Sequence, residues 1–299
     1  MKIISQEQIE ALNISPLQCY EWVEQALKGK STALLPTKIS LQPDMKGVFY
    51  NTMPVIIPDR GRAGLKLVTR YPNRKPSLDA QILLYDLPTG EHLAVMDGNW
   101  ITAMRTGAVA AHSIKLLARK DFSVIGMIGL GSTAKATFRV LMELYSDKPL
   151  VVKLLRYKEQ HELFAREFAE HENVEFIYCE TYKEVVVDSD VVISAVTFFE
   201  DDICATDDFK EGVLVMPIHT RGFLNCDLSF EKVFADDTGH VEGFKYFSKF
   251  KRFAEVADVI AGKKAGREND KERIIVYNIG IALHDVNFAS EIYNTYYLA

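Results

Sequence analysis

The 299-residue sequence has few cysteines, no long apolar run and no surplus of basic residues. Its four cysteines have neither metal-type nor redox-type spacing, so we expect buried free thiols and no metal site. No run is long enough to cross a bilayer, and the start, MKIISQEQIEALNISP, lacks the apolar core of a signal peptide. We therefore expect a cytoplasmic protein with no membrane partner.

The charge balance narrows the class of partner. A net charge of −6 argues against nucleic-acid binding, which needs an excess of Lys and Arg to neutralise phosphates. It does not argue against a local basic pocket for a small anion. Apolar residues at 48% and charged residues at 25% are typical of a folded globular protein, and this length favours a two-domain α/β chain.

The first third of the chain predicts a helix followed by strands. Residues 5–31 have apolar residues at helical spacing, with Ser5 as the N-cap, Gln8 as its capping-box partner and Gly29 as a stop. Residues 38–87 change to short alternating or β-branched runs, such as GVFYNTMPVII, broken by Pro and Gly. This texture predicts antiparallel strands, and an amphipathic helix begins near Ile101.

From residue 116 onward, strands alternate with helices. That spacing predicts βαβ units and a doubly wound parallel sheet of the Rossmann type. The final segment predicts a helix over residues 283–299 that returns to the first domain. We therefore predict a Rossmann-type domain over residues 116–282 and a smaller α+β domain over residues 1–115 that the last helix completes.

A glycine-rich turn follows the apolar strand at residues 124–128. Gly129, Gly131 and Ala134 form G-x-G-x-x-A, and a helix opens at Ser132. The first Gly permits a tight turn, the second lets a pyrophosphate approach the backbone, and the small third residue allows the helix to pack closely. In this context the motif predicts dinucleotide binding; the alternative is a tight βα turn with no ligand.

The end of the next strand carries a basic residue in place of the acid that grips the ribose of NAD. Arg156 in KLLRYKE occupies about that position. A cation there suits a 2′-phosphate, so we predict a preference for NADP(H), with NAD(H) as the alternative. Arg156 could equally stack on the adenine or face solvent.

Two cations stand in apolar surroundings. Arg105 lies in the first turns of its helix, where a positive charge gains nothing from the helix dipole, so we expect it to bind an anion. That anion is a substrate carboxylate, which the planar guanidinium binds in bidentate form, or an ion-pair partner such as Asp97. Lys66, between apolar neighbours, is either an exposed strand lysine or a buried amine with a lowered pKa.

Several blocks together resemble the ornithine cyclodeaminase/mu-crystallin family over nearly the whole chain. They are Met53 with Pro54, GLKLV, LLYDLPTGEHLAVMDGNWITAMRTGA, the glycine-rich turn and GRENDKERIIVYNIGIALHD, in one order. The resemblance implies a substrate-binding and dimerisation domain beside a Rossmann domain, in a homodimer. Family members include ornithine cyclodeaminases, amino-acid dehydrogenases and ketimine reductases.

The resemblance also implies roles for individual residues. Lys66 matches the active-site lysine, Arg105 the arginine that clamps the substrate carboxylate, and Lys38 the position of a second carboxylate-binding arginine. Cofactor contacts are implied at the diphosphate turn, by Ser132 and Thr133, and elsewhere by Ser77, Thr106, Val196, Thr197, Asn278 and Ile279.

Two departures from the family bear on the reaction. Asn51 replaces a glutamate before the Met-Pro pair and is assigned to substrate binding, and His219 falls near an aspartate of the loop after the fifth strand. His219 is either a general acid or base or a histidine hydrogen-bonded within its loop, with Thr220 and Arg221 as competitors for its position. Losing both acids weakens the case for ornithine cyclisation.

These inferences favour an NAD(P)H-dependent imino-acid (ketimine) reductase or amino-acid dehydrogenase that acts on a small α-amino or α-imino acid. The first alternative is an ornithine or lysine cyclodeaminase with recycled NAD. The second is a non-catalytic, crystallin-like protein that binds a cofactor and a small ligand.

Overall fold

The chain forms two compact units in a computed structural model that describes residues 1–196, 199, 201–219 and 221–297. Unit 1 comprises residues 1–105 and 280–299, and unit 2 comprises residues 106–279. The division lies inside helix α3 (Asn99–Leu117). The domain ranges predicted from the sequence, 1–115 with 283–299 and 116–282, stay a prediction.

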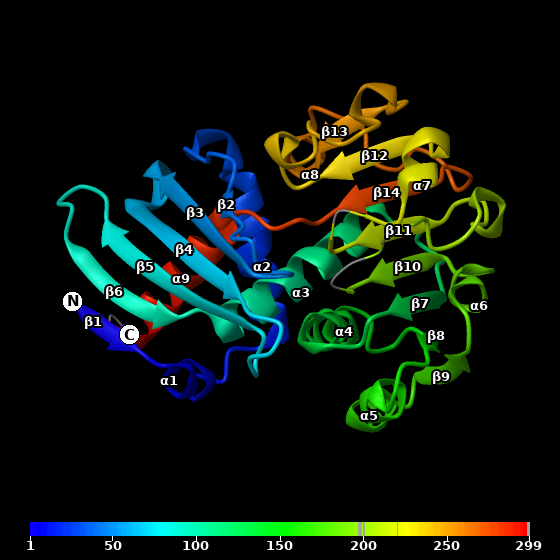
Figure 1. Cartoon of the computed structure of the whole chain (residues 1–299), viewed down its shortest axis with the longest axis horizontal. Helices are drawn as coiled ribbons and strands as arrows, with labels where there is room; N and C mark the ends of the chain where they lie inside the picture. The colour runs from blue at the N-terminus through cyan, green and yellow to red at the C-terminus, as the bar shows by residue number, and fades with distance from the viewer. Residues whose placement is uncertain (197–198, 200, 220, 298–299) are drawn as a thin grey trace. The chain divides into compact units, whose positions relative to one another are not determined.

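Unit 1 is built on a six-stranded sheet in the order β1-β6-β5-β4-β3-β2 (Figure 1). The strands from β2 to β6 pair antiparallel, as the alternating runs predict, and β1 joins β6 in parallel. The strands are β1 (Lys2–Ile4), β2 (Ile39–Leu41), β3 (Phe49–Ile57), β4 (Arg62–Arg70), β5 (Leu78–Asp86) and β6 (His92–Asp97). The helices are α1 (Gln6–Glu10), α2 (Pro16–Lys28), α9 (Ala282–Tyr297) and the 3-10 turns η1 (Lys30–Thr32) and η2 (Pro58–Arg60).

The N-terminal helix of the sequence prediction is in fact two helices. Ser5 and Gln8 form the predicted capping box of α1, and Gly29 caps the end of α2. Between them the chain turns at Asn13, which has a positive φ of 49°, and restarts with Ser15 as N-cap and Pro16 in the first turn. A proline is tolerated there because the first N–H groups of a helix have no partner inside it.

One face of the sheet in unit 1 is covered by α9, which crosses β3, β4 and β5 and also contacts α2 (Figure 1). The register places a single row of side chains across this face: Ile4, Met96, Ile82, Lys66 and Met53. All five are buried, so Lys66 is the charged member of an apolar row.

Close packing of α9 on β4 depends on Gly64. A Cβ at this position would lie 2.5 Å from the Leu83 carbonyl oxygen and 2.9 Å from Cγ2 of Val286. Both distances are shorter than side-chain carbons tolerate, and one involves backbone that cannot move aside. The missing side chain therefore lets the helix turn that carries Asp285 approach the sheet.

Unit 2 is an eight-stranded, wholly parallel sheet in the order β13-β12-β14-β11-β10-β7-β8-β9. The strands are β7 (Val124–Ile128), β8 (Leu150–Leu155), β9 (Val174–Cys179), β10 (Val191–Ser194), β11 (Leu214–Pro217), β12 (Lys232–Ala235), β13 (Phe253–Glu255) and β14 (Ile274–Tyr277). The order confirms the Rossmann-type fold, because the chain adds β8 and β9 on one side of β7 and then returns to add β10 and β11 on the other.

Helices and short turns connect these strands (Figure 1). They are α4 (Ser132–Leu144), α5 (Gln160–Glu167), α6 (Tyr182–Val186), α7 (Leu224–Ser229), α8 (Val256–Ile260) and the 3-10 turns η3 (Thr206–Asp208), η4 (Thr238–His240) and η5 (Phe247–Lys249). The central strands are buried along almost their whole length, as expected when both faces of a parallel sheet are covered.

Candidate functional site

Lys66 lies in the middle of β4 with its side chain on the covered face of the sheet in unit 1. It is 1% exposed, so the alternative of an exposed strand lysine is wrong. An isolated buried ammonium would cost several kcal/mol, and it therefore requires a partner. Its Nζ donates a 2.7 Å hydrogen bond to Oδ1 of Asp285 on α9.

The same carboxylate oxygen also accepts from Arg105. Arg105 Nε lies 2.9 Å from Asp285 Oδ1, and the three side chains are 0–6% exposed. Arg105 is thus ion-paired with Asp285 and not with Asp97, which accepts from the backbone N–H of Asn99. We call these residues the Lys66–Asp285–Arg105 cluster. Two cations share one carboxylate, which leaves an excess of positive charge.

A glycine makes room for the Arg105 guanidinium. A Cβ on Gly280 would lie 2.5 Å from Nη1 and 3.0 Å from Nη2, and the residue has a φ of +94° that side chains rarely adopt. Both constraints explain why the segment before α9 has no side chain here. Nη1 and Nη2 of Arg105 therefore lie beside Gly280, and Nε donates to Asp285 Oδ1.

The surroundings of Lys66 lower its pKa to about 7. Burial is the largest cause, the positive charges of Arg105 and Lys38 act in the same direction, and Asp285 opposes them. Lys38 lies just before β2 and is close enough to influence this amine electrostatically. An amine that titrates near neutrality can both give and accept a proton under working conditions.

Asn51 lies on the same face of the sheet as Lys66. It pairs with Val68 in the register of β3 and β4, two residues before Met53, which stands opposite Lys66. Its amide oxygen is buried without a hydrogen-bond partner among the described residues, as is Oδ2 of Asp285. Buried acceptors of this kind suit a ligand that brings N–H donors.

In unit 2, the predicted dinucleotide motif forms the turn between β7 and α4. Gly129 has a φ of +80°, and a Cβ there would lie 2.8 Å from the backbone of Ala195, which follows β10. The turn therefore lies where the strand order reverses between β7 and β10. Open parallel sheets bind dinucleotides at this switch point.

The rest of the turn leaves room and unpaired donors for a phosphate group. A Cβ on Gly131 would meet nothing within 4 Å, and Gly131 caps α4 without a side-chain hydrogen bond. Ser132 and Thr133 open the helix at this edge, while Ala134 is buried. Free N–H groups at a helix start bind phosphate, so these residues fit a dinucleotide.

Asn278, at the end of β14, adds an orphaned donor. It is 1% exposed, its Oδ1 accepts a 3.2 Å bond from Ser113, and its Nδ2 has no partner among the described residues. Neighbouring Ile279 packs partly against the core of unit 2, and Val196 lies beside Gly129. These placements are compatible with the implied cofactor contacts.

Three other implied cofactor residues are less informative. Thr106 is buried in α3, and Ser77 precedes β5, where its carbonyl accepts from Tyr71. Thr197 lies outside the described residues, as does Thr220.

Arg156 follows directly after β8, at the position expected for a residue that reads the ribose. Its side chain is half exposed, pairs with Glu180 at 3.2 Å and lies over the Tyr178 ring at 5.6 Å. An exposed pair of this kind is weak, and a phosphate dianion would compete with it for the guanidinium.

His219 follows β11 and reaches the end of the neighbouring strand. Its Nε2 lies 2.7 Å from Oγ of Ser194, the last residue of β10. Burial lowers the pKa of His219 to about 4, against a smaller opposing effect of the Arg221 backbone. The ring is therefore neutral at physiological pH and suits hydrogen bonding better than proton donation; Arg221 itself is exposed.

No group of three or more His, Cys, Asp or Glu residues suited to a metal ion occurs in the described part of the chain. Across the same residues, no helix is long and apolar enough to span a membrane. The four cysteines are unpaired thiols, as predicted; Cys19, Cys179 and Cys226 are buried, and Cys204 is half-buried.

The chain belongs to the ornithine cyclodeaminase/mu-crystallin family, whose model matches residues 1–297. The Delta(1)-pyrroline-2-carboxylate reductase of Bacillus cereus is 28% identical over 81% of this chain and 79% of that protein.

Two solved structures are similar over almost the whole chain. The reductase of the same name from Thermococcus litoralis, in complex with NADH and L-proline, aligns with a TM-score of 0.85, 27% identity, and coverage of 99% of this chain and 97% of that one. An archaeal alanine dehydrogenase dimer with bound NAD aligns with a TM-score of 0.84 and 26% identity over 99% and 95% of the two chains.

The sequence did not predict the roles of three residues of these sites: Asp285, Gly280 and Ser194. Asp285 was visible only as one acid in IALHDVNF, far along the chain from Lys66 and Arg105. The available signal was its place in the first turn of a helix with many apolar residues, where a buried acid needs a cation.

Proposed function

We propose that this protein is an NAD(P)H-dependent imino-acid reductase or amino-acid dehydrogenase that acts on the C–N bond of a small α-imino or α-amino acid. The observation that carries this proposal is the Lys66–Asp285–Arg105 cluster, which is buried, has excess positive charge and contains an amine with a pKa of about 7. We propose unit 1 as the substrate-binding and dimerisation domain and unit 2 as the NAD(P)-binding domain.

Arg105 binds the substrate carboxylate in this proposal. Its Nε is committed to Asp285, and its terminal NH2 groups offer the edge that a carboxylate binds in bidentate fashion. A substrate anion would also balance the second positive charge of the cluster, which Asp285 alone does not neutralise. Lys38 assists as a point charge, without the fork of an arginine.

Lys66 supplies the proton that the reaction consumes. Reduction of an imine adds a hydride to carbon and a proton to nitrogen, and the bound dinucleotide supplies the hydride. Protonated Lys66 donates to the substrate nitrogen. Asp285 orients the amine, and its negative charge raises the pKa of Lys66, so that a larger fraction of Lys66 is protonated. The free oxygen of Asp285 and that of Asn51 are acceptors for the N–H groups of the product amine.

For the cofactor, we propose NADP(H) in preference to NAD(H). The dinucleotide would lie on the Gly129–Gly131 turn with its diphosphate at the start of α4, near Ser132 and Thr133, and Asn278 would offer Nδ2 to its nicotinamide end. Arg156 supports the preference, because it is the cation at the end of β8 and no acid occupies its place.

We propose that the protein is a cytoplasmic homodimer. The face of the unit 1 sheet opposite α9 carries the apolar row Ile3, Val95, Leu83, Leu65 and Pro54. Beside this row, Ile39 and Leu41 on β2 are 57% and 62% exposed. Surfaces of this kind are typical of subunit contacts. Sedimentation velocity tests the assembly; a monomer at micromolar concentration would contradict it.

The proposed cytoplasmic location rests on the cysteines: unpaired cysteines suit a reducing compartment.

A substrate panel tests the reaction. The purified protein is offered cyclic imino acids, such as pyrroline- and piperideine-2-carboxylate, and 2-keto acids with ammonia, and the absorbance of NADPH or NADH is followed. We expect stoichiometric consumption of reduced cofactor with at least one substrate and its loss in Arg105→Leu. Ammonia release from ornithine or lysine without net redox change would instead identify a cyclodeaminase.

A further inference from the structure

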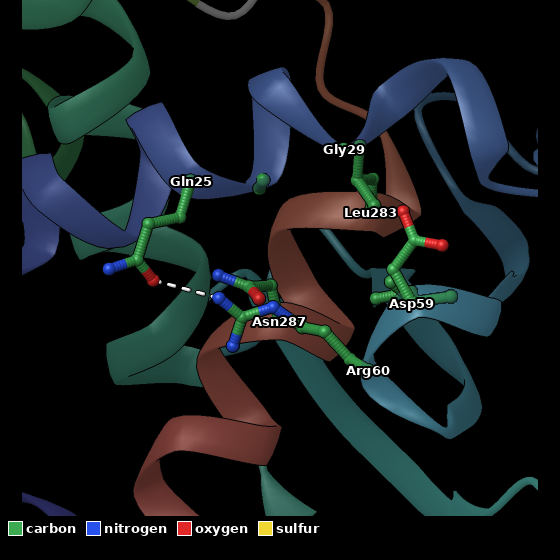
Figure 2. Close-up of a pocket in the computed structure, with 8 residues that line it drawn as sticks. Gln25, Gly29, Asp59, Arg60, Leu283 and Asn287 are labelled. Atoms are coloured by element: carbon green, nitrogen blue, oxygen red, sulfur yellow. Dashed lines mark hydrogen bonds between the residues drawn. The ribbon is translucent and has the colours of Figure 1, made fainter.

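A cavity of about 330 Å³ lies in unit 1 between three elements (Figure 2). Its walls come from the end of α2, the η2 turn and the first turns of α9. Eight residues line it: Gln25, Ala26, Gly29, Ile57, Asp59, Arg60, Leu283 and Asn287. Its volume is at the lower end of the range typical of small-molecule pockets.

Asn287 provides a buried, unpaired hydrogen-bond acceptor in this cavity. The residue is 0% exposed, and its Nδ2 donates a 2.9 Å bond to the carbonyl of Trp22. This bond fixes the orientation of the amide, because a carbonyl can only accept. Oδ1 is left without a partner among the described residues. A buried acceptor in this state costs free energy until an N–H donor reaches it.

Opposite charges complete the lining. Asp59 is exposed at one side, with Oδ2 accepting from Thr32. Arg60 donates from Nη2 to Gln25 at 2.8 Å and pairs through Nη1 with Glu291. Two of its five N–H donors are used in these contacts, so the guanidinium can still bind an anion. Figure 2 shows Asp59 and Arg60 on the η2 turn with Asn287 on α9.

We propose that this cavity is a second binding site, for a small aliphatic α-amino acid. The ammonium group donates to Asn287 Oδ1 and Asp59, the carboxylate accepts from Arg60, and the side chain packs on Ala26, Ile57 and Leu283. The zwitterion matches the lining because acceptors and a cation are both present, together with an apolar wall.

This site is separate from the Lys66–Asp285–Arg105 cluster but shares a helix with it. Leu283 and Asn287 flank Asp285 by two residues on each side, which is about 200° around α9. Asp285 therefore faces β4, and the cavity lies on the other side of the same turn. Occupancy of the cavity alters the position of Asp285 through this turn.

Calorimetric titration with L-valine and L-leucine tests the site. The titration uses the Arg105→Leu chain without cofactor, in which the cluster has lost its carboxylate clamp, so the outcome is independent of the proposed reaction. We expect one saturable site per chain in Arg105→Leu, and a second in the unaltered chain if the proposed function also holds. Isobutylamine and isobutyrate, which carry one charge each, should bind at least about tenfold more weakly.

Two variants in the same background locate the site. Asn287→Leu removes the buried acceptor and should weaken valine binding at least about tenfold, since hydrogen bonds to charged groups contribute most. Asp59→Asn, at an exposed position that should not affect folding, should weaken it several-fold. Asn294→Leu is the matched control on α9, because its Oδ1 accepts only at 3.5 Å from Arg62 and it does not line the cavity.

The proposal is overturned if Arg105→Leu binds neither amino acid, or if both cavity variants bind as tightly as Asn294→Leu. A crystal structure of the soaked protein with only ordered water in the cavity would also overturn it. In the unaltered enzyme, valine at saturation should change kcat or KM of imine reduction, and Asn287→Leu should abolish that change.

Discussion

The two units hold their polar groups in opposite ways. In unit 1, the Lys66–Asp285–Arg105 cluster places three ionisable side chains within an apolar layer, each 0–6% exposed. In unit 2, the Gly129–Gly131 turn has no charged side chain and offers backbone N–H groups and an open space, and Asn278 at the end of β14 adds one orphaned amide. One site depends on charge, and the other on shape.

This difference teaches which substitutions each site tolerates. Charges in a low-dielectric interior are strongly coupled, so removing one changes the ionisation of the others. A backbone site has no side-chain ionisation that a neighbouring substitution could change, but it fails when a side chain fills its space. The following predictions test that contrast, from the largest expected effect to the smallest.

Lys66→Met should lower kcat of imine reduction by about 10²- to 10⁴-fold, the range for loss of a general acid. Lys153→Met in unit 2 is the control, since its amine donates only to the carbonyls of Val187 and Glu184 in the described contacts. Steady-state kinetics on both variants decides the matter. Equal activity of the two would remove Lys66 from the mechanism.

Gly131→Leu should raise the Kd of the dinucleotide by about 100-fold, because the side chain occupies the space that a pyrophosphate needs. The melting temperature should change little, since nothing lies within 4 Å of the added Cβ. Gly243→Leu, at another glycine of unit 2 with open space, is the matched control. Fluorescence titration with NADPH provides the measurement; similar Kd values for the two variants would contradict a backbone site.

The pH profile should reveal the coupling within the cluster. With Lys66 as proton donor, kcat/KM for reduction falls as the pH rises through about 7, and the rate of amine oxidation rises over the same range. Asp285→Asn removes the negative charge that stabilises the Lys66 ammonium, so the pKa of Lys66 decreases further. The pH transitions of both reaction directions, the limbs of the profile, therefore move to lower pH.

Asp97→Asn, also in unit 1, is the control for this shift and should leave the limbs in place. Circular dichroism establishes that each variant is folded before the profile is measured. If Asp285→Asn left the limbs where they are in the unaltered enzyme, Asp285 would not act on Lys66.

Arg156→Ala should weaken NADPH binding by about tenfold or less and leave NADH binding nearly unchanged, because the exposed guanidinium contacts only the extra phosphate. The difference should shrink at high ionic strength. Arg139→Ala, which removes another exposed arginine of unit 2 in a salt bridge with Glu167, is the control. Equal losses for both cofactors would mean that Arg156 does not read the phosphate.

Local patterns predicted much of the fold. The Ser5–Gln8 capping box, the strands of residues 38–87, the alternation of strands and helices and the G-x-G-x-x-A turn were all confirmed, because each depends on residues close in sequence. The break between α1 and α2 was missed, since the apolar spacing continues across it while Ser15 and Pro16 restart the helix.

In the candidate site, too, features set by neighbouring residues in the sequence could be predicted, and contacts between distant residues could not. The sequence by itself determined that a cation stands near the start of α3, that a lysine stands in an apolar strand, and that a phosphate-binding turn follows β7. Only the tertiary structure decided that Lys66 is buried, that its partner and that of Arg105 is Asp285, and that Gly64 and Gly280 make the space for this arrangement. The physical reason is that a pKa and an ion pair depend on distance and burial, and about 180 residues of chain separate Arg105 from the carboxylate it binds.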